Sequence, residues 1–224
     1  MKIGVLLPGR FTDSGDYLAD ARALDAAGVD SLWLADDAFD PWMVLAGVAA
    51  VTGRTRLAAP VSALDAAAPD ALARRIATLE RLSRGRLLGA VTAAARPADT
   101  EGLIACARRA GPLPVLLQGG GDGQSLLGAR LADGIVAIVN EPKQCHAAFD
   151  QARDRRTRER LAAPFELWTR VPAPDGREAW RALRDAAAAV GATGIIVPAD
   201  PRLLDLLRNG DEEEDRSDLA LSQG

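Results

Sequence analysis

Aromatic residues, cysteine and histidine are scarce in this 224-residue chain, and each scarcity narrows the possible chemistry. Aromatic side chains make up 4% of the residues, so aliphatic and small side chains must fill the core. The two cysteines, Cys106 and Cys145, provide neither a disulfide framework nor the spacing of a metal site. The only histidine, His146, falls in a helical pattern that we expect at the surface. A Ser-His-Asp mechanism therefore has no suitable histidine.

The chain also lacks a long apolar run and a basic excess. The apolar start, residues 1–8, is too short for a signal peptide or a membrane span. The formal net charge is −4, and residues 211–218 alone hold six acids and one arginine. Without this block the charge is close to zero, which argues against nucleic acid as a partner. We expect a cytoplasmic protein that acts on a small molecule, without nucleic-acid or membrane partners.

Short apolar segments alternate with helical patterns from end to end. Eight segments are continuously apolar, as in parallel strands covered by helices, and we expect them to begin near residues 3, 31, 56, 86, 114, 135, 165 and 194. Helical spacing follows each segment, for example over residues 69–83, where we expect Leu72, Ile76, Leu79 and Leu82 to be buried. Glycine ends most of these helices.

Eight strand–helix units in one chain predict an α/β fold, a compact (β/α)8 barrel of the TIM type. The alternative is an open, doubly wound sheet, which the lack of a phosphate-loop motif disfavours. No change in composition marks an internal boundary. We expect one barrel domain over residues 1–208 and a solvated acidic tail over residues 209–224.

The carboxyl ends of the strands are where a barrel places its functional residues. The pattern brings a defined set of residues to these ends: Pro8 to Thr12, Asp36, Asp37, Val61, Ser62, Thr92, Gln118 to Gly123, Asn140, Glu141, Arg170, Ala199 and Asp200. Asp36 and Asp37 are adjacent on extended backbone, so their carboxylates point in different directions and are poorly placed to share a proton. At least one of them we interpret as structural, and no further ligands indicate a metal.

The sharpest local feature is the segment Gln118–Ser125, with sequence QGGGDGQS, between a strand and a helix. Its glycines allow a close approach of the backbone to a ligand, and the following helix offers free N–H groups to an anion such as phosphate. The alternative is a flexible turn without a ligand, because glycine-rich turns are common. The residues alone leave both open.

Four segments, in order, resemble the bacterial luciferase-like superfamily, which binds FMN or the deazaflavin F420. Residues 16–37 read DYLADARALDAAGVDSLWLADD, and residues 40–57 read DPWMVLAGVAAVTGRTRL. Residues 69–89 read PDALARRIATLERLSRGRLLG, and residues 119–135 read GGGDGQSLLGARLADGI. The resemblance covers most of residues 1–140. It implies an FMN- or F420-dependent oxidoreductase with its cofactor at the barrel mouth.

The resemblance also implies a set of cofactor-binding residues. The ring contacts would come from the strand ends and the phosphate contacts from the glycine-rich turn. The predicted cofactor-binding residues are Asp36, Asp37, Ser62, Thr92, Gln118, Gly119, Gly120, Gly121 and Ser125. Arg96, on the loop after strand 4, could add a charge near the phosphate. It further implies a non-proline cis peptide near Val61–Ser62. The catalytic acid or base stays unassigned.

Two departures from the family pattern bear on the reaction. Many members have histidine where this chain has Asp37. Members also commonly carry a long excursion between strands 4 and 5 that covers the site, whereas about twenty residues join those strands here. Oxygenation needs a site closed to water, whereas hydride transfer tolerates solvent better. We therefore expect hydride transfer rather than monooxygenation, with a slight preference for F420.

Two other functions fit the same residues. One is a non-catalytic flavin-binding homologue, and the other is an unrelated barrel enzyme acting on a phosphorylated small molecule. A homodimer is expected in addition, because the helix predicted over residues 41–52 is apolar on every side and a barrel covers only one face of it.

Overall fold

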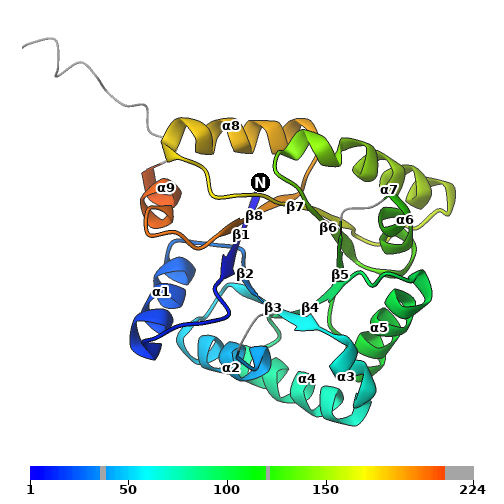
Figure 1. Cartoon of the computed structure of the whole chain (residues 1–224), viewed down its shortest axis with the longest axis horizontal. Coiled ribbons are helices and arrows are strands. Elements are labelled where there is room, and N and C mark those ends of the chain that lie inside the picture. The colour runs from blue at the N-terminus through cyan, green and yellow to red at the C-terminus, as the bar shows by residue number, and fades with distance from the viewer. Residues whose placement is uncertain (36–38, 120–121, 210–224) are drawn as a thin grey trace, which may run out of the picture.

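The protein forms a closed barrel of eight parallel strands in sequence order, with helices around the outside (Figure 1). The computed structural model describes residues 1–35, 39–119 and 122–209. The strands are β1 Lys2–Leu7, β2 Ser31–Leu34, β3 Arg56–Val61, β4 Leu87–Thr92, β5 Val115–Gln118, β6 Gly134–Ile138, β7 Glu166–Arg170 and β8 Gly194–Pro198. Each begins within one residue of the position expected from the sequence. The predicted TIM barrel is confirmed.

The helices lie between the strands, as the alternating pattern predicts. They are α1 Ser14–Ala26, α2 Pro41–Val51, α3 Ala63–Ala67, α4 Pro69–Ser83, α5 Pro97–Ala110, α6 Asp122–Leu131, the short 3-10 helix η1 Pro142–Cys145, α7 His146–Arg158, α8 Gly176–Ala189 and α9 Leu203–Asn209. Helix α2 begins where Asp40 accepts hydrogen bonds from the backbone N–H groups of Trp42 and Met43, with Pro41 in the first turn. Proline in the first turn of a helix lacks a backbone N–H, but an N–H at that position would have no acceptor within the helix.

Helix α4 buries one stripe of residues, but the stripe differs from the expected one at its end. Leu72, Ile76 and Leu79 are buried, as predicted, whereas Leu82 is 50% exposed. The fourth buried position is Ser83, four residues after Leu79. The prediction for Leu82 was wrong because the helical repeat of 3.6 residues carries the buried stripe to position 83.

Two separate cores hold the barrel together. The larger core lies between the sheet and the helices, and the smaller one fills the inside of the barrel. The inner core contains Trp33 and Trp168, whose rings meet edge to face with centroids 6.0 Å apart. Gly4 and Gly194 make room for them, since a Cβ at Gly4 would lie 2.8 Å from Trp33 Nε1 and a Cβ at Gly194 would overlap the Trp168 ring. The inside of the barrel is therefore filled and is no channel.

The connection between β4 and β5 is short, as expected. Helix α5 and two brief links make up residues 93–114, so this connection adds no excursion over the barrel mouth. The helices of the described residues are also too short or too polar to cross a membrane. The predicted acidic tail falls almost entirely outside the described residues, apart from Asn209 at the end of α9.

Candidate active site

Strand geometry divides the residues at the barrel mouth into two groups. Successive side chains of a strand point to opposite faces, so every second residue after an inner-core residue points toward the barrel axis. Leu88 and Ala90, Leu116, Val136 and Trp168 belong to the inner core. The same alternation turns the last residues of four neighbouring strands inward: Thr92, Gln118, Ile138 and Arg170. These four side chains line one side of the barrel mouth.

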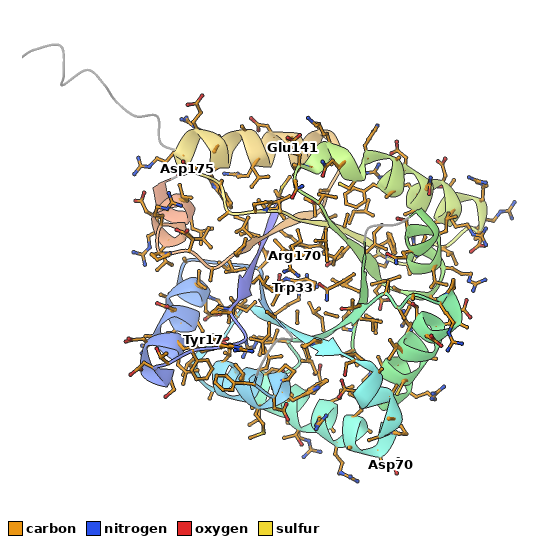
Figure 2. The ribbon with its side chains drawn as sticks, in the orientation of Figure 1. Tyr17, Trp33, Asp70, Glu141, Arg170 and Asp175 are labelled. Carbon is orange, nitrogen blue, oxygen red and sulfur yellow. The ribbon has the colours of Figure 1, made fainter. Side chains whose placement is uncertain are left out.

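The mouth is open to solvent. Ile138 points inward but is 47% exposed, and Thr92 is exposed as well. Gln118 and Arg170 are half-buried. Arg170 and Trp33 are labelled in the middle of the ring of strands in Figure 2. A ligand in the mouth would therefore rest above the inner core and meet polar groups from β4, β5 and β7.

Thr92 and Gln118, two of the predicted cofactor-binding residues, are brought together by the sheet. They are register partners across β4 and β5. The backbone N–H of Ala93, next to Thr92, donates to the carbonyl oxygen of Gln118 at 2.8 Å. The two side chains thus supply a hydroxyl and an amide on the same side of the mouth.

Ser62 has a structural role that the sequence reading did not anticipate. Its hydroxyl donates to the Asp65 carboxylate at 3.0 Å, and its backbone N–H donates to the same carboxylate at 2.9 Å. This capping box starts α3, a helix not expected from the sequence. Ser62 is nevertheless half-buried at the end of β3.

The peptide bond at Val61–Ser62 is trans, and the described residues contain no cis peptide bond. The cis bond implied by the family resemblance is therefore wrong. Ser62 instead continues the strand in extended conformation, with φ −113° and ψ 173°, directly into the cap of α3.

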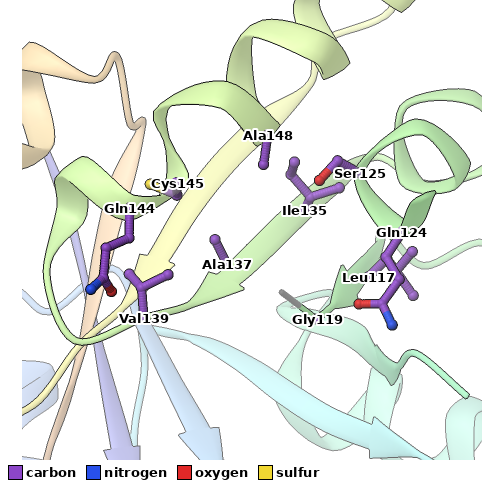
Figure 3. A pocket seen from close by; sticks show the side chains of 10 residues that line it. All are labelled: Leu117, Gly119, Gln124, Ser125, Ile135, Ala137, Val139, Gln144, Cys145 and Ala148. Atoms are coloured by element: carbon purple, nitrogen blue, oxygen red, sulfur yellow. The ribbon is translucent and has the colours of Figure 1, made fainter. Parts of the chain in front are cut away.

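Gly119 and Ser125 meet, but not in the mouth. Both line a cavity of about 20 Å³ between β5, β6, α6 and the start of α7 (Figure 3). Its other walls include Leu117, Ile135 and Ala137, which belong to the outer core. A space of that size holds about one water molecule and no phosphate group. Gly119 and Ser125 thus line a cavity on the outer side of the sheet.

The donors expected for a phosphate are only partly available. The backbone N–H of Gly119 already donates to the carbonyl oxygen of Val136 at 3.0 Å. Arg96, considered as an additional charge, is 78% exposed and forms an ion pair with Asp99 at 2.8 Å. Helix α6 does begin at Asp122, directly after the glycine-rich turn, so its first-turn N–H groups remain the natural anion donors.

Four of the predicted residues, Asp36, Asp37, Gly120 and Gly121, lie outside the described residues. His146 is exposed at the start of α7, and its Nε2 lies 3.4 Å from Asp150 Oδ2, so the expected surface position is confirmed. Within the described ranges no group of histidine, cysteine, aspartate and glutamate side chains could hold a metal ion.

The structure adds Ile138 and Arg170 to the site. Arg170 was among the strand-end residues but not among the predicted binding residues. The signal that identifies it is its position two residues after Trp168, which turns its side chain inward. In an apolar strand every residue is buried, either inside the barrel or against the helices. The sequence alone therefore does not show which residues face the barrel axis.

Comparison with known proteins agrees with this geometry. Residues 1–104 match the family model described as luciferase-like monooxygenase. This part of the chain is similar to that family. No curated protein sequence matches the chain.

Solved structures share the fold of the chain at low sequence identity. One is a coenzyme F420-dependent tetrahydromethanopterin reductase from Methanopyrus kandleri, with TM-score 0.71, 12% identity and coverage of 94% of this chain and 97% of that chain. An F420-dependent secondary alcohol dehydrogenase has TM-score 0.71, 14% identity and coverage of 92% and 95%. A monooxygenase from Streptomyces bottropensis has TM-score 0.67, 18% identity and coverage of 93% and 97%.

Proposed function

We propose that this protein is a flavin- or F420-dependent oxidoreductase whose cofactor, FMN or F420, binds at the mouth of the barrel. The observation that carries the proposal is the match of residues 1–104 to the luciferase-like family, on a barrel whose open mouth presents Thr92, Gln118 and Arg170. Proteins that share this fold include an F420-dependent reductase and an F420-dependent dehydrogenase. Barrel enzymes place their chemistry at this end of the strands.

The residues of the mouth fit a planar ring with polar edges. Thr92 and Gln118 offer a hydroxyl and an amide that can hydrogen-bond to ring nitrogens and carbonyl groups. Ile138 presents exposed apolar surface against which a ring face can pack. The phosphate would be held by first-turn N–H groups of α6, with Ser125 next to it in the adjoining cavity. Gly119 would contribute by the absence of a side chain.

The bound cofactor would supply the hydride chemistry, and the chain would supply position and electrostatics. Thr92 and Gln118 would orient one edge of the ring. The inner core beneath, with Trp33 and Trp168, closes the barrel from below and prevents water from entering by that route. The open mouth favours hydride transfer over oxygenation, because oxygenation requires a site closed to water and the β4–β5 connection adds no cover.

Titration with each cofactor tests this proposal. We expect FMN or F420 to bind the full chain with a dissociation constant well below about 1 mM, which corresponds to roughly −4 kcal/mol. Gly120→Val should weaken binding about tenfold or more, because the new side chain obstructs the phosphate turn. The control is Gly102→Val in α5, where an added Cβ meets nothing within 4 Å. Binding of neither cofactor would refute the proposal.

A non-catalytic cofactor-binding protein is the second candidate, and one observation favours it. The inward-facing strand ends Thr92, Gln118 and Arg170 provide a hydroxyl, an amide and a guanidinium, and none of them is a carboxylate or histidine that could act as a general acid or base. The two candidates differ in turnover. Cofactor binding without oxidation or reduction of any alcohol, aldehyde or imine tested would support the non-catalytic function.

The proposal includes a homodimer. Helix α2 is covered on its inner face by the barrel, α1 and α4, but Met43 is 71% exposed. A second copy of the chain could cover this outer face. We further propose that residues 1–208 form one domain, that residues 209–224 are a solvated tail, and that the protein is cytoplasmic. The free, buried cysteines Cys106 and Cys145 are consistent with a reducing compartment.

A further inference from the structure

The charged side chains at the two ends of the barrel differ in how many partners they have. At the amino-terminal end, Glu166 accepts hydrogen bonds from Lys2 at 2.6 Å, from Arg56 at 2.9 and 3.2 Å, and from Trp168 Nε1 at 2.7 Å. At the mouth, Arg170 lies four residues further along the same strand and also points inward. Within the described part of the chain it forms no ion pair and no side-chain hydrogen bond.

Arg170 has an apolar setting. Its register partners in the sheet are Ile138 on β6 and Ile196 on β8. Two residues before it, Trp168 belongs to the inner core and is fully buried. Burial of the guanidinium in this setting lowers the pKa of Arg170 from its usual value. Among the described residues no counter-ion compensates for the hydration that this half-buried cation loses, and such a loss destabilises a folded protein.

A guanidinium at the barrel mouth that has no counter-ion among the described residues can bind an anionic ligand. Its five N–H donors form a planar fork that matches the two oxygens of a carboxylate. The expected phosphate donors, at the amino terminus of α6, follow β5, which is separated from β7 by β6. Two strand spacings amount to roughly 10 Å. Arg170 is therefore suited to a second anionic group, nearer to the barrel axis than the cofactor phosphate.

We propose that Arg170 binds a carboxylate of the substrate, and that the substrate packs an apolar part against the exposed face of Ile138. This assignment rests on the proposed function, since it concerns the ligand that shares the mouth with the cofactor. It names the substrate class as carboxylic acids with an apolar body. Arg170 contacts the substrate directly and takes no proton in the reaction.

Calorimetric titration with benzoate and its neutral isostere benzamide tests the assignment on the full chain, with and without FMN or F420. Benzoate should bind the wild type in at least one of these states, and benzamide at least tenfold more weakly. Arg170→Met should weaken benzoate binding about tenfold to a hundredfold, as expected for loss of a charge-assisted hydrogen-bond pair. Arg170→Lys should retain part of the affinity, since it keeps the charge but not the fork.

The control is Arg130→Met, which removes the same charge from α6 on the outside of the barrel, where Arg130 pairs with Glu101. It should leave benzoate binding unchanged. Equal binding of benzoate by wild type and Arg170→Met would overturn the proposal, as would no benzoate binding in any state. Benzoate binding without cofactor does not depend on the proposed function. Failure of the carboxylate-binding proposal can therefore be distinguished from failure of the proposed cofactor-dependent function.

Two further measurements exclude other roles. Arg170→Met should bind FMN almost as tightly as the wild type does, and the same should hold for riboflavin, which lacks the phosphate. A loss confined to FMN would assign Arg170 to the cofactor phosphate and overturn the proposal. The midpoint of thermal unfolding of Arg170→Met should equal or exceed that of the wild type, because the variant removes a charge that has no counter-ion in the described part of the chain. A marked fall would indicate a structural role and count against the assignment.

Discussion

Two tryptophans fill the barrel beneath the mouth, and glycines at the lower rim leave space for their rings. Trp33 donates from Nε1 to the Ser31 hydroxyl at 2.8 Å, so its polar atom is satisfied inside the barrel. Trp168 donates in the same way to Glu166. These contacts fix the floor on which a ligand in the mouth would rest.

At the residue scale we predict that Gly194→Ala destabilises the protein by about 1–3 kcal/mol, because the new methyl group overlaps the Trp168 ring. Gly102→Ala should instead stabilise it by about 0.5–1 kcal/mol, since this helical position is open and alanine restricts the unfolded chain. Urea unfolding of both variants measures the difference. Similar stability of the two variants would show that Trp168 is not packed against Gly194.

Glu166 supports a second prediction, on pH dependence. Burial raises the pKa of its carboxyl, but hydrogen bonds from Arg56, Lys2 and Trp168 outweigh this and lower the pKa from 4.5 to about 2. The ion pairs therefore contribute stability above about pH 4.5, and this contribution is lost as the pH falls toward 2. Glu166→Gln should cost about 1–3 kcal/mol at pH 7, after allowance for partial exposure.

The check is the free energy of unfolding of wild type and Glu166→Gln between pH 2 and pH 7. The gap between them should narrow as the pH falls. A gap that stays constant over this range would mean that the Glu166 carboxylate is not held by these cations.

Single residues at the mouth were the hardest to assign from the sequence. The strand ends could be located, but a strand end does not reveal which side of the sheet a side chain faces. Thr92 and Gln118 face the barrel axis, whereas Gly119 and Ser125 line a cavity on the outer side. A shift of one residue reverses the face, so predicted boundaries with an uncertainty of one residue cannot separate the two groups.

At the scale of elements, helices were predicted well where proline, aspartate or glycine marks their ends. Helix α2 begins at Pro41 behind its Asp40 cap, as expected. Helix α3 was missed because five residues offer no helical repeat, and only the Ser62–Asp65 capping box marks its start. Leu82 was assigned to the wrong face because the buried stripe of α4 continues at Ser83.

Helix α2 also carries the prediction on assembly. Trp42, Leu45 and Val48 face the barrel, whereas Met43 is 71% exposed on the outer face. If this face forms the dimer contact, Met43→Glu should convert the dimer to a monomer at micromolar concentration without loss of folding, because it places a charge in an apolar interface. Sedimentation velocity measures the change.

The control for assembly is Leu126→Glu, a charge placed at an exposed leucine on α6, on another part of the barrel surface. This variant should sediment like the wild type. A monomeric wild type at the same concentration would contradict the dimer.

At the scale of the whole molecule, the alternation of strands, helices and glycine stops was enough to predict the closed barrel. The first three segments of the resemblance, within residues 16–89, fall inside the family match over residues 1–104. The site was only partly predictable, because its residues come from strands far apart in the sequence and their convergence depends on barrel closure. The sequence does not show that Arg170 lacks an ion-pair partner among residues 1–35, 39–119 and 122–209; this requires the structure.

The most direct test of the central claim is a crystal structure of the protein with FMN or F420 bound. We predict that the ring lies in the mouth above Trp33 and Trp168, within reach of Thr92 and Gln118, and that the phosphate lies at the amino terminus of α6. A ring bound elsewhere on the protein, or a phosphate far from the segment Gln118–Ser125, would contradict the proposed site.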